Sequence, residues 1–229
     1  MVQGYLQIVR ALPLFSGMSQ ANFDTLVAEA SLQAMPQHAA LFAEGSVPNY
    51  LHVAIEGSVE LYGSHDEHET AIDIMQPVTA FILAEVICDS VYLKSARTLS
   101  ASQILLIPAK TVRDIFERDA TFARAIVKEL AELYRHTVRA LKNEKLRSSA
   151  ERLANWILQT DAEQGHQRTI ELTFDKRTLA SSLGMTPENL SRNLALLAKH
   201  GVKSSGRDIV IEDVEALQKF AKPNVLIDG

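Results

Sequence analysis

The sequence has a single cysteine, Cys88, among its 229 residues. No disulfide bond can therefore form within the chain, and an oxidising compartment is not indicated. No run of about 18 apolar residues occurs, so no membrane-spanning helix is expected. The N-terminus lacks the basic start and apolar core of a signal peptide. Together these absences predict a cytoplasmic protein.

Common catalytic motifs are also missing. The sequence contains no nucleophile elbow, no phosphate-binding loop and no metal-protease helix. The paired acids Glu67 and Glu69 have no further catalytic groups around them, and the spacing of His65 and His68 favours an exposed polar hairpin loop over a divalent-metal site. We therefore expect a protein that is not an enzyme, with no catalytic residue and no metal ligand.

Charge is distributed unevenly along the chain, although the net charge is -5. Residues 1–144 carry 11 Lys and Arg against 17 Asp and Glu, whereas residues 145–229 carry 12 against 11. Within residues 175–207 the count is 6 basic against 2 acidic, a local charge of +4. A local positive segment is what contact with nucleic-acid phosphates requires.

That basic segment begins with a pattern of two short helices joined by a glycine turn, at residues 175–198. Asp175 can cap the first helix, Gly184 can end it, and Thr186 followed by Pro187 can start the second. Apolar residues recur at helical spacing in both parts, at Leu179, Ala180, Leu183, Leu190, Leu194 and Leu197. This is the layout of a helix-turn-helix that places its second helix in the DNA major groove. A plain helical hairpin with a solvated polar face is the alternative.

The polar residues of the second helix are the predicted DNA readers. A carboxylate accepts a hydrogen bond from the cytosine amino group, and an arginine pairs with two atoms of guanine. The expected base contacts are Glu188, Ser191 and Arg192. Residues 199–211 contain a short strand on either side of a Ser-Ser-Gly turn, which is typical of the wing of a winged helix. The expected phosphate contacts are Lys176, Arg177, Thr186, Asn189, Lys203 and Arg207.

Proline and glycine are absent from residues 109–159, which predicts a long helix with a break near residues 143–149. Side chains at alternating spacings of four and three form a predicted dimer seam of Ile126, Leu130, Leu133, Thr137 and Ala140. A helix packed on its own domain would show the same stripe. The dimer is favoured because a helix-turn-helix usually acts as a two-fold dimer on a two-fold DNA site. Residues 150–158 then begin the last domain, with Leu153, Trp156 and Ile157 facing its core.

The first hundred residues have the short alternating runs of a β-rich domain. A helical entry is expected over residues 12–32, followed by strands at 50–62 on either side of Gly57, at 71–75 and at 102–107. We predict an α+β protein with a sensor domain at 1–108, a dimerisation helix at 109–146 and a winged helix-turn-helix domain at 147–229.

Three passages in this order resemble the CRP/FNR family of bacterial transcription regulators: residues 14–19, residues 51–61 with Glu-Gly-Ser-Val at 56–59, and residues 179–197. The resemblance covers nearly the whole chain. It implies a cyclic-nucleotide-binding-type β-roll, a homodimer, contact with double-stranded DNA and RNA polymerase, and control by a small-molecule or gas effector. A cyclic-nucleotide-type regulatory subunit that does not bind DNA shares the β-roll and is the alternative.

The reading helix is similar to that of the FNR branch, since Glu188, Ser191 and Arg192 occupy matching positions. The CRP branch carries an arginine one residue before this glutamate, where the present chain has Pro187. The resemblance therefore implies a DNA half-site close to TTG with a dyad-related CAA.

The effector region departs from the cyclic-AMP-binding branch, whose phosphate cassette has Gly-Glu followed by Arg-Ser about ten residues later. Here the corresponding residues are Ala84, Glu85, Ser95 and Arg97, with Ala96 between the last two. A buried phosphate needs an arginine fork and free backbone amides, so cyclic AMP is disfavoured, and a cyclic-nucleotide-responsive regulator is the second interpretation.

An iron–sulfur cluster is not expected, because it needs about four thiolates and Cys88 is alone. The chain is similar to the NnrR and DNR regulators in lacking both the cysteines and the nucleotide cassette. This resemblance implies a nitrogen-oxide response, with haem as a candidate cofactor. Haem needs an axial ligand such as histidine, but none of the seven histidines is singled out. His52 is expected to be a packed core residue, and Cys88 a small buried one.

Overall fold

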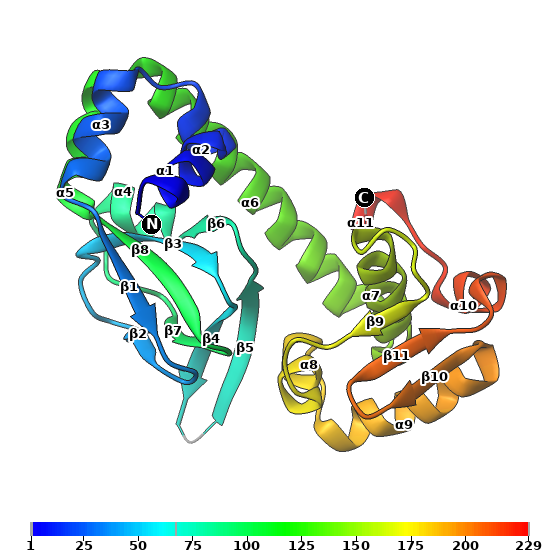
Figure 1. Cartoon of the computed structure of the whole chain (residues 1–229). Coiled ribbons are helices and arrows are strands. Elements are labelled where there is room, and N and C mark those ends of the chain that lie inside the picture. The colour runs from blue at the N-terminus through cyan, green and yellow to red at the C-terminus, as the bar shows by residue number, and fades with distance from the viewer. Residues whose placement is uncertain (1, 67, 229) are drawn as a thin grey trace. The chain divides into compact units, whose positions relative to one another are not determined.

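The computed structural model describes residues 2–66 and 68–228, and the chain divides after Leu133 into two compact units (Figure 1). Residues up to Leu133 form the sensor unit, and residues from Tyr134 onward form the winged unit. Among the described residues, no helix combines the length and the apolar character that crossing a membrane would require.

The sensor unit is built on two antiparallel four-stranded sheets. The first has the order β1-β8-β3-β6, with strands Ser31–Met35, Ser102–Pro108, Tyr50–Glu56 and Thr79–Phe81. The second has the order β2-β7-β4-β5, with strands Ala40–Phe42, Ser95–Thr98, Val59–His65 and His68–Met75. Side chains from both sheets are buried in one core, including Leu51, Val53, Leu61, Ala96 and Ile104. The strands predicted from the sequence at 50–62, 71–75 and 102–107 are confirmed.

Gly57 forms the tight connection between β3 and β4. Its φ is +78°, and a Cβ there would lie 2.2 Å from the Ser102 hydroxyl oxygen and 2.5 Å from the Ala101 carbonyl oxygen. Both the backbone conformation and the space therefore require glycine.

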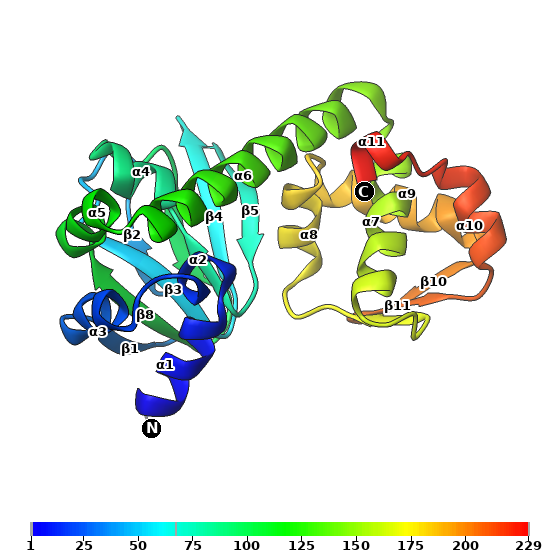
Figure 2. The same cartoon turned by 90° about the horizontal axis from the view of Figure 1, so that it is seen from above.

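Helices cover one end of these sheets in both views (Figure 1, Figure 2). They are α1 (Val2–Ala11), α2 (Pro13–Ser16), α3 (Gln20–Ala28), α4 (Leu83–Cys88) and α5 (Ala109–Arg118). The expected helical entry at 12–32 was wrong at both ends, since α1 precedes it and β1 begins at Ser31. Ser19 caps α3 by accepting a hydrogen bond from the Asn22 amide, which breaks the entry into separate helices.

The predicted continuous helix from residue 109 is interrupted at Asp119. This residue is extended, with φ -111° and ψ 97°, and α6 (Ala120–Leu146) begins directly after it. Its carboxylate accepts hydrogen bonds from the Thr121 and Phe122 amides at 3.0 Å each, and from the Asn22 side chain at 2.8 Å. Aspartate competes for backbone amides in this way and starts a new helix without any proline or glycine.

The winged unit holds the last part of α6 and a separate small core. Its helices are α7 (Ser149–Glu163), α8 (Lys176–Ser182), α9 (Pro187–Leu197), a 3-10 turn η1 (Ala198–His200), α10 (Val214–Ala221) and α11 (Val225–Asp228). Its antiparallel sheet has the order β10-β11-β9, with strands Val202–Ser205, Asp208–Ile211 and Thr169–Glu171. The predicted break near 143–149 is confirmed between α6 and α7, where Ser148 and Glu151 form a reciprocal capping box. Leu153 and Ile157 are fully buried, and Trp156 packs against the same core.

Replacing Asp119 with alanine should lower the free energy of unfolding by about 1–2 kcal/mol at neutral pH, because the α6 cap is lost. The Asn22 amide and the backbone amides lower the pKa of Asp119 from 3.8 to about 2. Its stabilising contribution is thus complete above pH 4 and disappears as the pH falls from about 4 to about 2. Urea unfolding of both proteins across this range measures the difference. The control is Glu117→Ala, which removes an exposed acid from α5. An equal loss of stability in this variant would contradict the role of Asp119 as the cap of α6.

Candidate nucleic-acid interface

The two helices and the turn predicted from the sequence are confirmed. Asp175 caps α8 by accepting a hydrogen bond from the Thr178 amide at 2.8 Å, and this bond lowers the pKa of the Asp175 carboxyl. Thr186 caps α9 by accepting from the Asn189 amide at 3.2 Å. Between the helices, Gly184 adopts φ +61°, which lets the first helix end and the chain reverse within a few residues.

The three predicted base readers lie on one exposed face of α9. Glu188, Ser191 and Arg192 are exposed, while Leu190, Asn193 and Leu197 are buried on the other side of the helix. Its own backbone amide and the Thr186 hydroxyl lower the pKa of Glu188, with a smaller contribution from Arg192. The same face continues through residues that the sequence reading did not select as contacts: Ala195, Leu196 and Lys199. An acid and an arginine side by side on an open helix can recognise the edges of a C·G pair.

Local hydrogen bonds restrain some of the predicted contacts. The Ser191 hydroxyl donates to the Pro187 carbonyl at 3.0 Å, and the Asn189 amide group donates to the Ser149 hydroxyl at 3.3 Å. The Thr186 hydroxyl is the helix cap described above. Asn189 thus joins the start of α9 to the start of α7, and its side chain points at the protein in this structure.

The wing is the hairpin of β10 and β11, with Gly206 (φ +56°) and Arg207 at its turn. Lys176 donates from α8 to the Ser204 hydroxyl at 2.8 Å, which ties the wing to the helix-turn-helix. Lys203 pairs with Glu212 at 2.6 Å on the surface, so part of its charge is already balanced. Arg177 and Arg207 are exposed, as phosphate contacts would need to be.

The buried Arg152, which was not predicted from the sequence, forms hydrogen bonds to the turn of the helix-turn-helix. Arg152, on α7, donates from Nε to the Leu183 carbonyl at 3.0 Å and from Nη2 to the Gly184 carbonyl at 3.1 Å. Its Nη1 donates to the Arg147 carbonyl at 3.2 Å, in the α6–α7 linker. Glu144 at the end of α6 completes the set with an ion pair at 3.3 Å. One guanidinium therefore connects the end of α6, the linker and the turn.

Gly184 lies directly against Glu144. A Cβ at position 184 would be 2.8 Å from the Glu144 carboxylate oxygen, in addition to the strain of a positive φ. The backbone conformation of the turn therefore requires glycine, and any side chain at this position would also displace the half-exposed Glu144 carboxylate.

In the sensor unit, the four predicted effector residues do not form a free phosphate fork. Glu85 is buried in α4, and the Ser95 hydroxyl accepts a hydrogen bond from the Glu44 amide at 3.0 Å. Arg97 donates to Glu60 at 2.6 Å and to Glu69 at 2.8 Å, and its guanidinium lies 4.2 Å from the centre of the Tyr62 ring. Ala84 is half-buried. The Arg97 guanidinium is thus already paired with the Glu60 and Glu69 carboxylates, whereas binding of a phosphate would need it unpaired.

The histidines and the cysteine give no obvious cofactor site. His52 is buried beside Phe42 and Phe81, with ring centroids at 5.1 and 5.4 Å, and burial lowers its pKa to about 4. It is a packed core residue, as expected. Cys88 is exposed at the end of α4, so the expectation of a buried thiol was wrong. Residue Glu67 lies outside the described residues, and among those described no cluster of three or more metal-type side chains occurs.

The proposed dimer seam is only partly exposed on α6. Ile126 is 1% exposed and belongs to the core of its own sensor unit. Leu130 also packs against this core, whereas Leu133, Thr137 and Ala140 are exposed. A second row of apolar side chains on α6 is also exposed and was not predicted. Its members are spaced by four and three residues: Tyr134, Val138 and Leu141. A dimer contact through α6 would therefore begin beyond Ile126 and include this second row.

Comparisons with known proteins agree with this architecture. The Cyclic nucleotide-binding domain family matches residues 32–119, and the Crp-like helix-turn-helix domain family matches residues 151–220. A CRP-like cAMP-activated global transcriptional regulator of Mycobacterium tuberculosis is 22% identical, over 94% of this chain and 99% of that protein. FixK2 from Bradyrhizobium japonicum has a TM-score of 0.76 at 18% identity, over 86% of this chain and 99% of that one. DNR from Pseudomonas aeruginosa has a TM-score of 0.51 at 22% identity, over 93% and 96% of the two chains.

Replacing Arg152 with methionine should leave the Leu183, Gly184 and Arg147 carbonyls without their donor. We expect the free energy of unfolding to fall by about 2–3 kcal/mol, since several hydrogen bonds to a charged group are lost. Arg207→Met serves as the control, because it removes an exposed arginine from the wing turn of the same unit. Thermal and urea unfolding measure the stability of both variants. An equal loss of stability in the two would show that the hydrogen bonds of Arg152 do not contribute more than an exposed arginine does.

Proposed function

The chain belongs to the CRP/FNR family of transcription regulators, and we propose that it binds a two-fold DNA site as an effector-controlled homodimer. The observation that carries this proposal is the exposed face of α9, where Glu188, Ser191 and Arg192 project together from a capped helix. The wing and the basic residues around it supply phosphate contacts on either side of that face.

The proposed target is a TTG half-site with a dyad-related CAA. The guanidinium of Arg192 would pair with O6 and N7 of the guanine, and the Glu188 carboxylate would accept from the amino group of a cytosine. Ser191 would assist by exchanging its bond to the Pro187 carbonyl for one to a base or phosphate. Pro187 begins the helix where the CRP branch has an arginine, which supports the FNR-like site. Among the predicted phosphate contacts, Arg177 and Arg207 are exposed and have the clearest access.

The proposed dimer brings two α6 helices together along the exposed rows. Heptad-like spacing favours a second helix of the same kind, because each side chain then inserts between those of its partner. The two reading helices would lie about one DNA turn apart, roughly 34 Å. Binding of an effector would shift the population between two dimer arrangements, and contact with RNA polymerase would follow on the bound DNA.

The effector is proposed to be a small molecule or gas that needs no phosphate fork. The Mycobacterium relative carries cAMP activation in its name, but here Arg97 is held by Glu60 and Glu69. A nitrogen-oxide response, by resemblance to NnrR and DNR, is the leading candidate, and cyclic AMP is the second. Haem would supply the gas-binding iron, yet the closely packed His52 ring and the surface positions of His65 and His68 do not fit an axial ligand. Absorption spectra with added haem and nitric oxide, beside a cyclic-AMP titration, separate the two candidates.

Mobility-shift titration on a TTG–CAA dyad tests the function. Arg192→Ala should weaken binding to this dyad by about 1–3 kcal/mol and relax specificity at one base pair. Arg118→Ala, which removes an exposed arginine from α5, should change nothing. Equal weakening of Arg192→Ala on every sequence would show that Arg192 contacts only phosphate. Failure of the unaltered protein to shift DNA would favour a regulatory subunit of the cyclic-nucleotide type.

Sedimentation tests the dimer. Leu133→Glu and Leu141→Glu each place a charge in the exposed rows of α6, so both variants should sediment as monomers. Lys128→Glu changes an exposed charge on the opposite side of the same helix and should leave the dimer intact. An unchanged dimer in both leucine variants would refute the α6 assignment.

A further inference from the structure

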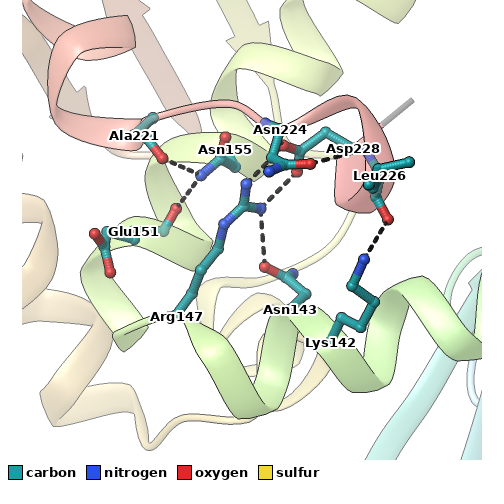
Figure 3. A network of polar contacts seen from close by, with 9 residues as sticks. All are labelled: Lys142, Asn143, Arg147, Glu151, Asn155, Ala221, Asn224, Leu226 and Asp228. Atoms are coloured by element: carbon teal, nitrogen blue, oxygen red, sulfur yellow. Dashed lines mark hydrogen bonds and ion pairs between the residues drawn. The ribbon is translucent and has the colours of Figure 1, made fainter.

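The segment from Ala221 to Asp228 lies against the junction of α6 and α7 (Figure 3). Its main contact is a two-pronged ion pair: Arg147 donates from Nη1 to Asp228 Oδ1 at 2.5 Å and from Nη2 to Oδ2 at 2.6 Å. The Arg147 side chain is only 7% exposed, and its bond to Asp228 raises the Arg147 pKa. A bidentate pair in this setting is geometrically specific and stronger than a surface ion pair.

Arg147 occupies the short linker between the two helices. Its Nη1 also donates to the Asn143 side chain on α6 at 3.1 Å, and its carbonyl accepts from Arg152 on α7 at 3.2 Å. The side chain and the backbone of this linker residue are therefore both held. Few residues are available to absorb a change of angle between α6 and α7, and hinges are usually short segments of this kind.

Further bonds attach the same segment on both sides of the linker. Lys142 on α6 donates to the Leu226 carbonyl at 3.1 Å. On α7, the buried Asn155 donates to the Ala221 carbonyl at 2.7 Å. The Asn224 amide donates to Asp228 at 2.6 Å and holds the carboxylate in position. We call residues 221–228 with these contacts the brace.

The brace acts on the helix that would read DNA. Leu190 and Leu197 of α9 share one core with Leu153 and Ile157 of α7, so α9 moves with α7. Any rotation of α7 at the linker would therefore change the direction of α9 relative to the end of α6. In a two-fold dimer this direction decides whether both reading helices meet their half-sites together.

We propose that the brace fixes the angle between α6 and α7, and that Arg147 and Asp228 are positioning residues for DNA binding although neither lies on the reading face. The inference rests on the proposed DNA-binding function. A positioning role differs from a role in stability alone. Loss of the Arg147–Asp228 pair should weaken binding to every DNA sequence equally and leave the preference between bases unchanged.

Asp228→Asn in the full chain tests the proposal, with Glu215→Gln as the control that removes an exposed acid from α10. Hydrogen exchange in the absence of DNA should show amides of residues 144–150 exchanging about tenfold faster in Asp228→Asn. Titration on the TTG–CAA dyad should show about tenfold weaker binding, equal on the dyad and on single-base variants of it. Asp228→Glu, which keeps the carboxylate, should recover most of both effects.

Unchanged exchange at the linker would overturn the brace, and faster exchange with unchanged DNA affinity would overturn the positioning role. A loss confined to one base pair would also contradict it. If the unaltered protein binds no DNA, the proposed function fails, whereas the exchange measurement still decides whether the brace holds the linker. Arg147→Lys gives a second test should Asp228→Asn lower the yield of folded protein, because a lysine keeps the charge and loses the fork.

Discussion

The buried guanidinium of Arg152 is the interaction on which the winged unit depends. A buried charge is costly unless hydrogen bonds and an opposite charge compensate for it. Here the carbonyls of Leu183, Gly184 and Arg147 accept hydrogen bonds from it, and Glu144 supplies the opposite charge. These groups come from the turn, the linker and α6. The hydrogen bonds and the ion pair of Arg152 therefore also fix the arrangement of these three segments. The exposed face of α9 that is proposed to read DNA takes its position from this arrangement.

Arginine has a different use in the sensor unit. Arg97 bridges β7 to β4 and β5 through two carboxylates and stacks on Tyr62, so its charge is neutralised by side chains instead of carbonyls. Its guanidinium links neighbouring strands of this sheet. The chain therefore matches the cyclic nucleotide-binding domain family while its Arg97 is paired with carboxylates of its own sheet, so the fold alone does not determine the effector.

Local features were predictable from the sequence, and features that depend on distant partners were not. The caps Asp175 and Thr186, the glycine turn and the hairpin around Gly57 depend on neighbours within a few residues. The break at Asp119 depends partly on Asn22, almost a hundred residues away, and the burial of Ile126 depends on a core whose residues come from distant parts of the chain. The roles of Arg152 and Arg147 were not predicted, because nothing in the sequence nearby shows the carbonyls and the carboxylates with which they pair. Cys88 is exposed for a similar reason: the end of α4 is not covered.

The contact between Gly184 and Glu144 has a consequence for how such sequences diverge. The two positions are forty residues apart in the chain, yet a side chain at 184 would collide with the carboxylate at 144. A side chain at 184 would be strained by the positive φ, and it would also displace the half-exposed Glu144 carboxylate from its place beside Arg152. A single substitution at 184 would thus be felt at Arg152 as well, and the ordering of α6 against the turn would change together with the turn itself.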